Sequence, residues 1–104
     1  MKPLFIPLKT EYYDAFANGT KQTEFRPYGP RWNERTCRVG RDVVLSRGYG
    51  RKHRMTGTVV DFRRYKWPTR TRVWKAIYGD KQVEFAACIG IRVTHAVAGD
   101  GYGG

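Results

Sequence analysis

The chain has 104 residues, of which 40% are hydrophobic and 14% aromatic, and its formal net charge is +11. This composition fits one folded domain and excludes a disordered chain, and no apolar run approaches the roughly 20 residues that cross a bilayer. The proline-interrupted start MKPLFIPLK is too short for a signal peptide, so we expect a cytoplasmic protein. We also expect it to be a monomer with no membrane contact.

The first elements predicted along the chain are a strand and a helix. Residues 3–9, PLFIPLK, read as a short strand with its prolines near the edges, where a missing N–H does least harm. Residues 10–19, TEYYDAFANG, predict a helix of about two turns with Thr10 as its N-cap. Tyr12 and Phe16 are four residues apart and are expected on the buried face of this helix.

The middle of the chain predicts three more extended segments. Residues 21–28 continue from the helix as a strand, and residues 29–35 form a loop or a single helical turn. A strand over about 42–47 ends in a glycine-rich turn, and residues 54–65 form the next strand. Gly57 inside that strand predicts a bulge or a sharp bend, as small barrels need at their corners.

The last part of the chain predicts a helix, a strand and a tail. Residues 69–79 carry apolar side chains at helical spacing and end in glycine. Residues 84–97 form the last strand, and residues 98–104 are expected to be a flexible tail. We therefore expect a single domain over residues 1–97.

These elements predict the fold class. Several short strands with two short helices indicate an α+β domain built as a small mixed or antiparallel β-barrel, because parallel βαβ wrapping needs more crossover helices. Side chains fill the interior of a small barrel. A ligand site is therefore expected outside the barrel, in a cleft between the sheet and a helix.

Positive charge is concentrated in one stretch of the chain. Ten of the twenty Lys and Arg residues, with one acid, lie between Arg47 and Lys75. Aromatic residues are interleaved with these cations, and that combination favours single-stranded nucleic acid over a merely basic surface, because arginines hold phosphates while rings stack bases. The residues of this stretch that we expect to contact the ligand are Arg47, Tyr49, Arg51, Arg54, Arg63, Arg64 and Trp67.

The cysteines and histidines argue against a metal centre. Cys37 and Cys88 are far apart and match no metal-ligand spacing, and His53 and His95 are isolated from each other. Nothing marks the chain as secreted, so both thiols are expected to be free. We expect no metal and no cofactor.

Residues 19–26, GTKQTEFR, place three ionisable side chains at short offsets after the predicted helix. Glu24 and Arg26 share one face of the predicted strand by two-residue alternation, whereas Lys21 reaches that face only through the turn at Gly19. A partly buried carboxylate there needs a cationic partner. The three side chains therefore either line a ligand cleft or form an ion pair that closes the barrel.

This stretch resembles a known family. Gly19, Lys21, Glu24 and Arg26 match the G-x-K-x-x-E-x-R signature of the ASCH domain, a relative of the PUA RNA-binding domains. The order of predicted elements, the length and the basic charge are also similar, over about residues 3–93. The resemblance implies a PUA-like β-barrel in which the lysine, glutamate and arginine line a cleft for nucleic acid or a modified nucleobase.

The residues and the resemblance together predict a nucleic-acid-binding module. We expect RNA, another single-stranded nucleic acid or a nucleotide as its partner. Glu24 would accept a hydrogen bond from the exocyclic amine of cytosine, while Lys21 or Arg26 contacts a phosphate or a carbonyl oxygen. The basic and aromatic stretch after Arg47 would extend this groove.

The alternative is a small hydrolase with Lys21 and Glu24 as catalytic residues, acting as a ribonuclease or on a modified nucleoside such as an N4-acylcytidine. The family subgroup that hydrolyses acylated cytidines uses a threonine where this chain has Glu24, together with a late glutamate, for which Glu84 is the nearest candidate. Pairing with Glu24 would also keep Lys21 charged, which argues against this mechanism. A protein that acts through protein contacts is a third class.

Overall fold

The computed structural model describes residues 1–66 and 85–97, and six elements lie within them. The helix is α1 (Thr10–Ala17), and the strands are β1 (Leu4–Leu8), β2 (Thr23–Pro27), β3 (Asp42–Arg47), β4 (Arg54–Lys66) and β5 (Phe85–Val97). Their positions confirm the predicted strands and the first predicted helix. The predicted helix over 69–79 and the predicted tail over 98–104 lie outside the described residues.

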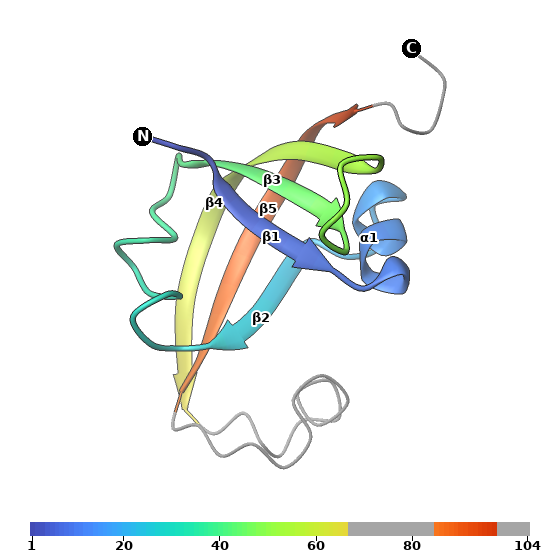
Figure 1. Cartoon of the computed structure of the whole chain (residues 1–104). Helices are drawn as coiled ribbons and strands as arrows, with labels where there is room; N and C mark the ends of the chain where they lie inside the picture. The colour runs from blue at the N-terminus through green and yellow to red at the C-terminus, as the bar shows by residue number, and fades with distance from the viewer. Residues whose placement is uncertain (67–84, 98–104) are drawn as a thin grey trace.

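The five strands form one mixed sheet. Its order is β1-β3-β4-β5-β2, with β1 parallel to β3 and every other neighbouring pair antiparallel. The sheet is curled, so that β1 and β2, which stand at its two ends, approach each other (Figure 1). This confirms an α+β fold with a barrel-like sheet.

The long strand β4 bends because its pairing with β5 is irregular at two places. The register shifts between Thr56 and Gly57 and again between Val59 and Asp61. Such bulges increase the local twist of a strand and bend it. At Gly57 a Cβ atom would lie 2.7 Å from the carbonyl oxygen of Arg92 on β5, so the two strands approach too closely for a side chain. The bulge or bend predicted at Gly57 is therefore confirmed.

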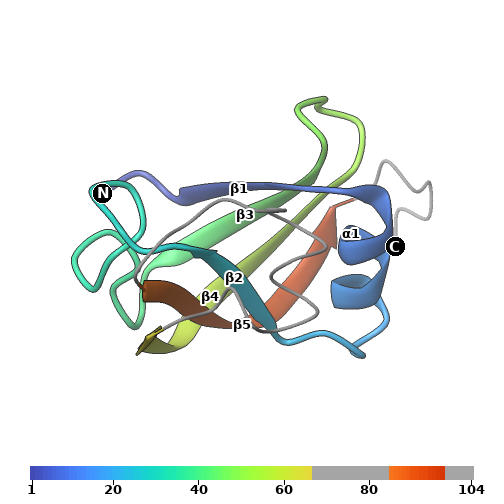
Figure 2. The same cartoon turned by 90° about the horizontal axis from the view of Figure 1, so that it is seen from below.

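The hydrophobic core lies inside the curl. Alternate residues of each strand point inward, and Phe16 of α1 and Trp32 of the loop between β2 and β3 close the core. α1 lies at one end of the curled sheet (Figures 1 and 2). The largest side chains that are fully buried there are Ile6, Phe16, Cys37, Val43, Leu45, Ser46, Met55, Val59 and Ile89.

The ends of α1 correct one prediction and confirm another. Thr10 is the first residue of the helix and not its N-cap, because Lys9 is extended and its carbonyl already accepts hydrogen bonds from the N–H groups of Tyr12 and Tyr13. At the other end Gly19 has φ +85°, the left-handed conformation that glycine adopts most readily. The chain can therefore turn sharply from the helix into β2.

Two further expectations from the sequence concern residues 29–35 and the crossing of a membrane. Residues 29–35 form a loop of bends and turns with no helix, organised by hydrogen bonds of the Asn33 side chain to the carbonyls of Gly29 and Pro30. In the part of the chain that the structure describes, no helix is both long enough and apolar enough to span a membrane.

Candidate nucleotide-binding site

The turn after α1 places Lys21 between the helix and the sheet. The N–H of Lys21 donates to the carbonyl of Ala15 in the helix at 3.0 Å, and the N–H of Ile91 on β5 donates to the carbonyl of Gln22 at 2.8 Å. These bonds fix the backbone on both sides of the lysine. Lys21 can thus lean toward β2, as the turn at Gly19 was expected to allow.

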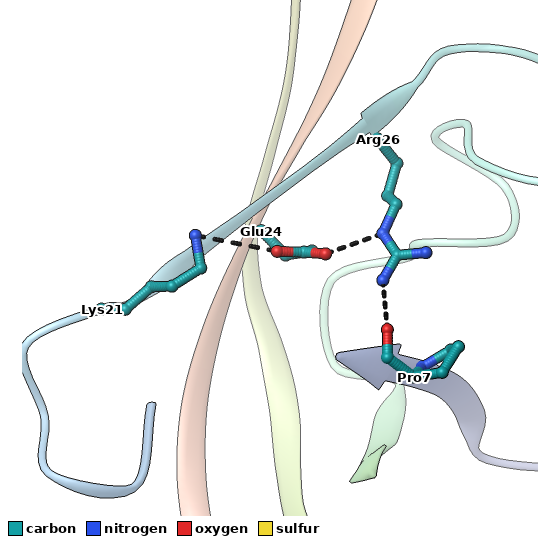
Figure 3. A network of polar contacts seen from close by, with 4 residues as sticks. All are labelled: Pro7, Lys21, Glu24 and Arg26. Atoms are coloured by element: carbon teal, nitrogen blue, oxygen red, sulfur yellow. Dashed lines mark hydrogen bonds and ion pairs between the residues drawn. The ribbon is translucent and has the colours of Figure 1, made fainter. Parts of the chain in front are cut away.

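Lys21, Glu24 and Arg26 form a charged row (Figure 3). The Lys21 Nζ lies 3.7 Å from Glu24 Oε1, and the Arg26 Nε donates to Glu24 Oε2 at 2.7 Å. The Arg26 Nη2 also donates to the carbonyl oxygen of Pro7 at 2.6 Å. The three side chains therefore converge, with the carboxylate between the two cations.

Arg26 joins the two ends of the sheet. It belongs to β2 and Pro7 belongs to β1, and these are the first and last strands in the sheet order. The guanidinium also lies 4.9 Å from the ring centroid of Trp32, which packs in the core. The pair of Glu24 and Arg26 thus closes the gap between the two end strands, which is the structural role that the sequence left open.

Glu24 is almost completely buried and incompletely bonded. It pairs in register with Ile89, an inward-facing residue of β5, and only 4% of its surface is exposed. Its Oε1 atom has no hydrogen-bond partner, and Lys21 stands beside it beyond hydrogen-bonding distance. An ionised carboxylate has about four acceptor positions, and leaving a buried one unused costs free energy. Oε1 can therefore accept a further donor.

The ammonium group of Lys21 is enclosed by aromatic rings. Its Nζ lies 5.3 Å from the ring centroid of Tyr12, 5.5 Å from that of Phe16 and 5.3 Å from that of Phe25. Cation–π attraction holds a cation at such distances. Burial lowers the pKa of Lys21 below its usual value, and this effect exceeds the opposing effect of the Glu24 carboxylate. Pairing alone, as considered from the sequence, would have raised it.

A cleft of about 750 Å³ opens beside Lys21, between the end of α1 and the bulged part of β4 and β5. Glu24 and Arg26 do not line it. The residues that do are Phe16, Ala17, Asn18, Gly19, Lys21, Gln22, Thr23, Val60, Asp61, Gly90, Ile91, Arg92 and Val93. Its charged groups are the cations Lys21 and Arg92 and the acid Asp61, and its apolar walls come from the helix and both strands.

Five polar residues of this cleft were not predicted as site residues: Asn18, Gln22, Thr23, Asp61 and Arg92. Gln22 lies directly after Lys21, Asp61 follows the second bulge of β4, and Arg92 is exposed on β5. Asp61 is the one acid in the basic stretch from Arg47 to Lys75, and this position could have marked it as a site residue. Arg92 had no comparable signal, because it lies far along the chain from the motif and reaches the cleft through the pairing of β4 with β5.

The structure places the predicted basic residues in two groups. Arg47, Tyr49, Arg51 and Arg54 lie at the hairpin that joins β3 to β4, whereas Arg63 and Arg64 lie near the far end of β4. Trp67 lies outside the described residues. Neither group lines the cleft beside Lys21.

The arginines near the end of β4 are already engaged. Arg63 pairs with Asp61 at 3.1 Å, and the Arg64 guanidinium lies 5.1 Å from the ring centroid of Tyr28 and 4.6 Å from that of Phe85. Arg63 is therefore paired with an acid, and the Arg64 guanidinium is in contact with two rings.

The thiols are buried and free, and no metal cluster is found among residues 1–66 and 85–97. No group of three or more His, Cys, Asp or Glu side chains there could hold an ion. Burial raises the pKa of Cys37, and burial followed by the charge of Asp61 raises the pKa of Cys88 to about 11. Both thiols are therefore protonated and unreactive at neutral pH.

Comparison with known proteins adds no relative. No protein-family model matches this chain, and no curated protein matches it. The resemblance to the ASCH domain therefore depends on the motif and the order of elements alone, and it stays a prediction.

Proposed function

We propose that this protein is an ASCH-type, PUA-like module that binds single-stranded RNA and takes one nucleotide into the cleft beside Lys21. The observation that carries the proposal is the position of the Lys21 ammonium, between a cleft large enough for a nucleotide and a buried carboxylate oxygen that lacks a donor. Ligand sites of about 300–1,000 Å³ are typical for small molecules.

The chemistry of the cleft suits a nucleotide with an amino group on its base. Lys21 and Arg92 are cations that can contact a phosphate. Glu24 Oε1 is buried and does not line the cleft, but if Lys21 turns toward a phosphate, its ammonium leaves the position beside Oε1. An exocyclic amine, as cytosine N4 provides, can then take that position and donate to Oε1. Phe16, Ile91 and Val93 supply apolar wall for the base.

The charge of the whole chain supports the same class of ligand. A net charge of +11 attracts polyanions and speeds their association. Each phosphate that is neutralised releases counterions, so binding should weaken as salt rises, with a slope of about −0.7 per contact for a single strand.

The test is fluorescence anisotropy with labelled oligocytidylate and oligouridylate of about 12 nucleotides, a length that covers a typical single-strand site. Lys21→Ala should weaken oligocytidylate binding about tenfold, which is about 1.4 kcal/mol. Lys2→Ala removes the same charge from an exposed position outside the cleft, and it should cost less than about twofold.

Glu24→Gln tests the role of the carboxylate as an acceptor for the base. It should reduce the preference for oligocytidylate over oligouridylate, because an amide donates as well as accepts. Equal losses in Lys21→Ala and Lys2→Ala, with no change of base preference in Glu24→Gln, would show that the cleft does not bind the nucleotide. Circular dichroism of each variant confirms that it folds.

A second candidate function follows from the lowered pKa of Lys21. A lysine whose pKa is lowered gives up its proton more readily and can then act as a general base. In an N4-acylcytidine it would take a proton from water while the water oxygen adds to the acyl carbonyl; the C–N bond then breaks, the cytidine nitrogen regains a proton, and a carboxylic acid leaves. Mass spectrometry of timed incubations should show that the N4-acylcytidine is consumed by the wild type but not by Lys21→Ala. Chelators should have no effect on this consumption.

A further inference from the structure

We propose that the β3–β4 hairpin is a second contact site for single-stranded nucleic acid, separate from the cleft. We call residues 47–54 together with Phe5 the hairpin platform. Tyr49 stacks an unpaired base, and the neighbouring cations hold the adjoining phosphates. The inference shares with the proposed function only the class of ligand, and it does not require the cleft.

Tyr49 is the most exposed aromatic side chain among the described residues. The residue is 79% exposed, and its ring centroid lies 6.3 Å from that of Phe5 on β1, at an interplanar angle of 40°. One exposed aromatic residue is ordinary on a protein surface. This residue, however, is in contact with a second ring and still leaves most of its surface accessible to a base.

Backbone bonds hold the hairpin in one shape. Gly48, at φ +71°, donates its N–H to the carbonyl of Leu8 at 2.8 Å, and the Arg47 N–H donates to the carbonyl of His53 at 3.0 Å. The Ser46 hydroxyl donates to the carbonyl of Gly50 at 3.0 Å. The Tyr49 ring is therefore presented on a prearranged turn, so little ordering entropy is lost when a ligand binds.

The hairpin platform is strongly positive and electrostatically unpaired. Four of the eight residues 47–54 are Lys or Arg, and no acid lies in the sequence between Asp42 and Asp61. The ion pairs of the described residues all lie elsewhere, at Glu24 and at Asp61. Arg54 contacts the Phe5 ring at 5.3 Å and the carbonyl of Gly50 at 3.3 Å, and neither contact neutralises its charge.

The cations of the hairpin platform differ from those near the end of β4 in how far they are already engaged by other groups. The arginines near the end of β4 are held by an acid or stacked on rings, whereas Arg51 and Lys52 in the hairpin are exposed and outside every ion pair of the described residues. A single strand needs an open ring together with unneutralised cations. The hairpin platform offers the more exposed ring, since Tyr49 is 79% exposed and Tyr65 51%, together with two exposed cations outside these ion pairs.

The hairpin platform and the cleft are different sites. They share no residue, since the cleft is lined by the end of α1, the segment that follows it to Thr23, residues 60–61 of β4 and residues 90–93 of β5. In Figure 2 the hairpin projects beyond β1, whereas the segment from α1 to β2 lies on the other side of the molecule. Variants of the two sites therefore report on separate contacts.

The experiment uses two probes, cytidine monophosphate and the labelled oligocytidylate. Tyr49→Ala should weaken oligocytidylate binding about tenfold, as loss of one stacked base predicts, and should leave binding of the monophosphate unchanged. Tyr49→Phe keeps the ring and should bind like the wild type. Tyr65→Ala removes the ring of another exposed residue, which is 51% exposed near the far end of β4. It should weaken oligocytidylate binding by less than about twofold.

The cations of the hairpin platform have a separate readout. The double variant Arg51→Ala and Lys52→Ala should reduce the slope of log affinity against log salt concentration by about 1.4, or 0.7 for each lost phosphate contact. The matched double variant Lys2→Ala and Lys9→Ala changes two exposed residues outside the hairpin. It should leave that slope within about 0.3 of the wild type.

Each outcome separates the inference from the proposed function. If Tyr49→Ala binds oligocytidylate like the wild type, or no worse than Tyr65→Ala, the hairpin inference is overturned whatever the cleft variants do. If Tyr49→Ala weakens binding while Lys21→Ala does not, the hairpin inference stands and the cleft proposal fails. If Tyr49→Ala loses binding to phosphatidylserine vesicles but not to RNA, the hairpin platform contacts a membrane surface and the inference is overturned.

Discussion

Lys21 experiences two opposing effects on its pKa. Enclosure by Tyr12, Phe16 and Phe25 removes water from the ammonium and lowers the pKa, while the Glu24 carboxylate raises it. Burial is the larger effect, and the neighbouring Arg26 adds to it. The folded protein therefore holds this proton less tightly than the unfolded chain does.

This difference predicts how stability depends on pH. Between the lowered folded pKa of Lys21 and its usual 10.5, the unfolded chain binds more protons, so the free energy of unfolding rises as pH rises. Lys21→Met removes this contribution. Urea unfolding at intervals between about pH 7 and 9.5 should show the wild type gaining stability relative to Lys21→Met as pH increases.

A constant difference between the two proteins across that range would contradict a lowered pKa. The range ends below 10 because the pKa of Tyr12 is raised, chiefly by burial. A raised tyrosine pKa has the opposite sign: the unfolded chain loses that proton first, so stability falls at higher pH.

Among the elements, β4 determines where the sites lie. Its two register shifts against β5 bend thirteen residues into a curl. The bend at Val60 and Asp61 forms one wall of the cleft, while the two ends of the strand carry the two basic groups. A straight strand of this length would span about 40 Å and could not pack along its whole length on one small core.

The close approach at Gly57 predicts a sharp difference between two glycine substitutions. Gly57→Ala would place Cβ 2.7 Å from a backbone oxygen of β5, and backbone cannot move aside cheaply. We expect a loss of about 2 kcal/mol or more, equivalent to roughly 10 °C in melting temperature for a domain of this size.

Gly50→Ala is the matched control. A Cβ at Gly50 meets no atom within 4 Å, and this glycine does not have a positive φ. The substitution should be neutral or slightly stabilising, since alanine restricts the unfolded chain. Equal melting temperatures for the two variants would show that β4 and β5 can separate at Gly57 without cost.

At the scale of the whole molecule, the sheet is closed by side chains. In the described part of the chain, β1 and β2 are not paired with each other by backbone hydrogen bonds. The Arg26 guanidinium spans the gap to Pro7 and is anchored on buried Glu24. The same carboxylate whose Oε1 lacks a hydrogen-bond partner thus uses Oε2 to hold the fold together.

Loss of this connection should be costly. Arg26→Ala leaves the Glu24 carboxylate buried with only Lys21 beside it, and we expect a loss of about 3 kcal/mol in unfolding free energy. Arg63→Ala breaks an exposed pair with Asp61 and should cost less than about 1 kcal/mol. Urea midpoints for both variants provide the comparison.

Arg26→Lys separates charge from geometry. A lysine keeps the positive charge but lacks the rigid planar guanidinium, whose Nε and Nη2 donate to Glu24 and Pro7. The free energy of unfolding of Arg26→Lys should lie between those of the wild type and Arg26→Ala. If Arg26→Ala were as stable as Arg63→Ala, the connection between β1 and β2 would have no role in closing the sheet.

Local chemistry along the chain was sufficient to predict the strands, α1, the turn at Gly19, the bulge at Gly57 and the row of Lys21, Glu24 and Arg26. Alternation, glycine conformation and short charge offsets act within a few residues, so they can be recognised before the chain is folded. The N-cap was misassigned by one residue, because a favourable side chain at Thr10 did not outweigh the backbone turn formed at Lys9.

Other features depend on contacts between residues far apart in the chain. Arg26 meets Pro7, and Arg92 joins a cleft beside Lys21, only because the sheet curls and β5 pairs with both β2 and β4. The direction of the Lys21 pKa shift likewise follows from three rings that only the folded chain assembles. Burial and distance are properties of the packed molecule, and they determine which charges remain available to a ligand.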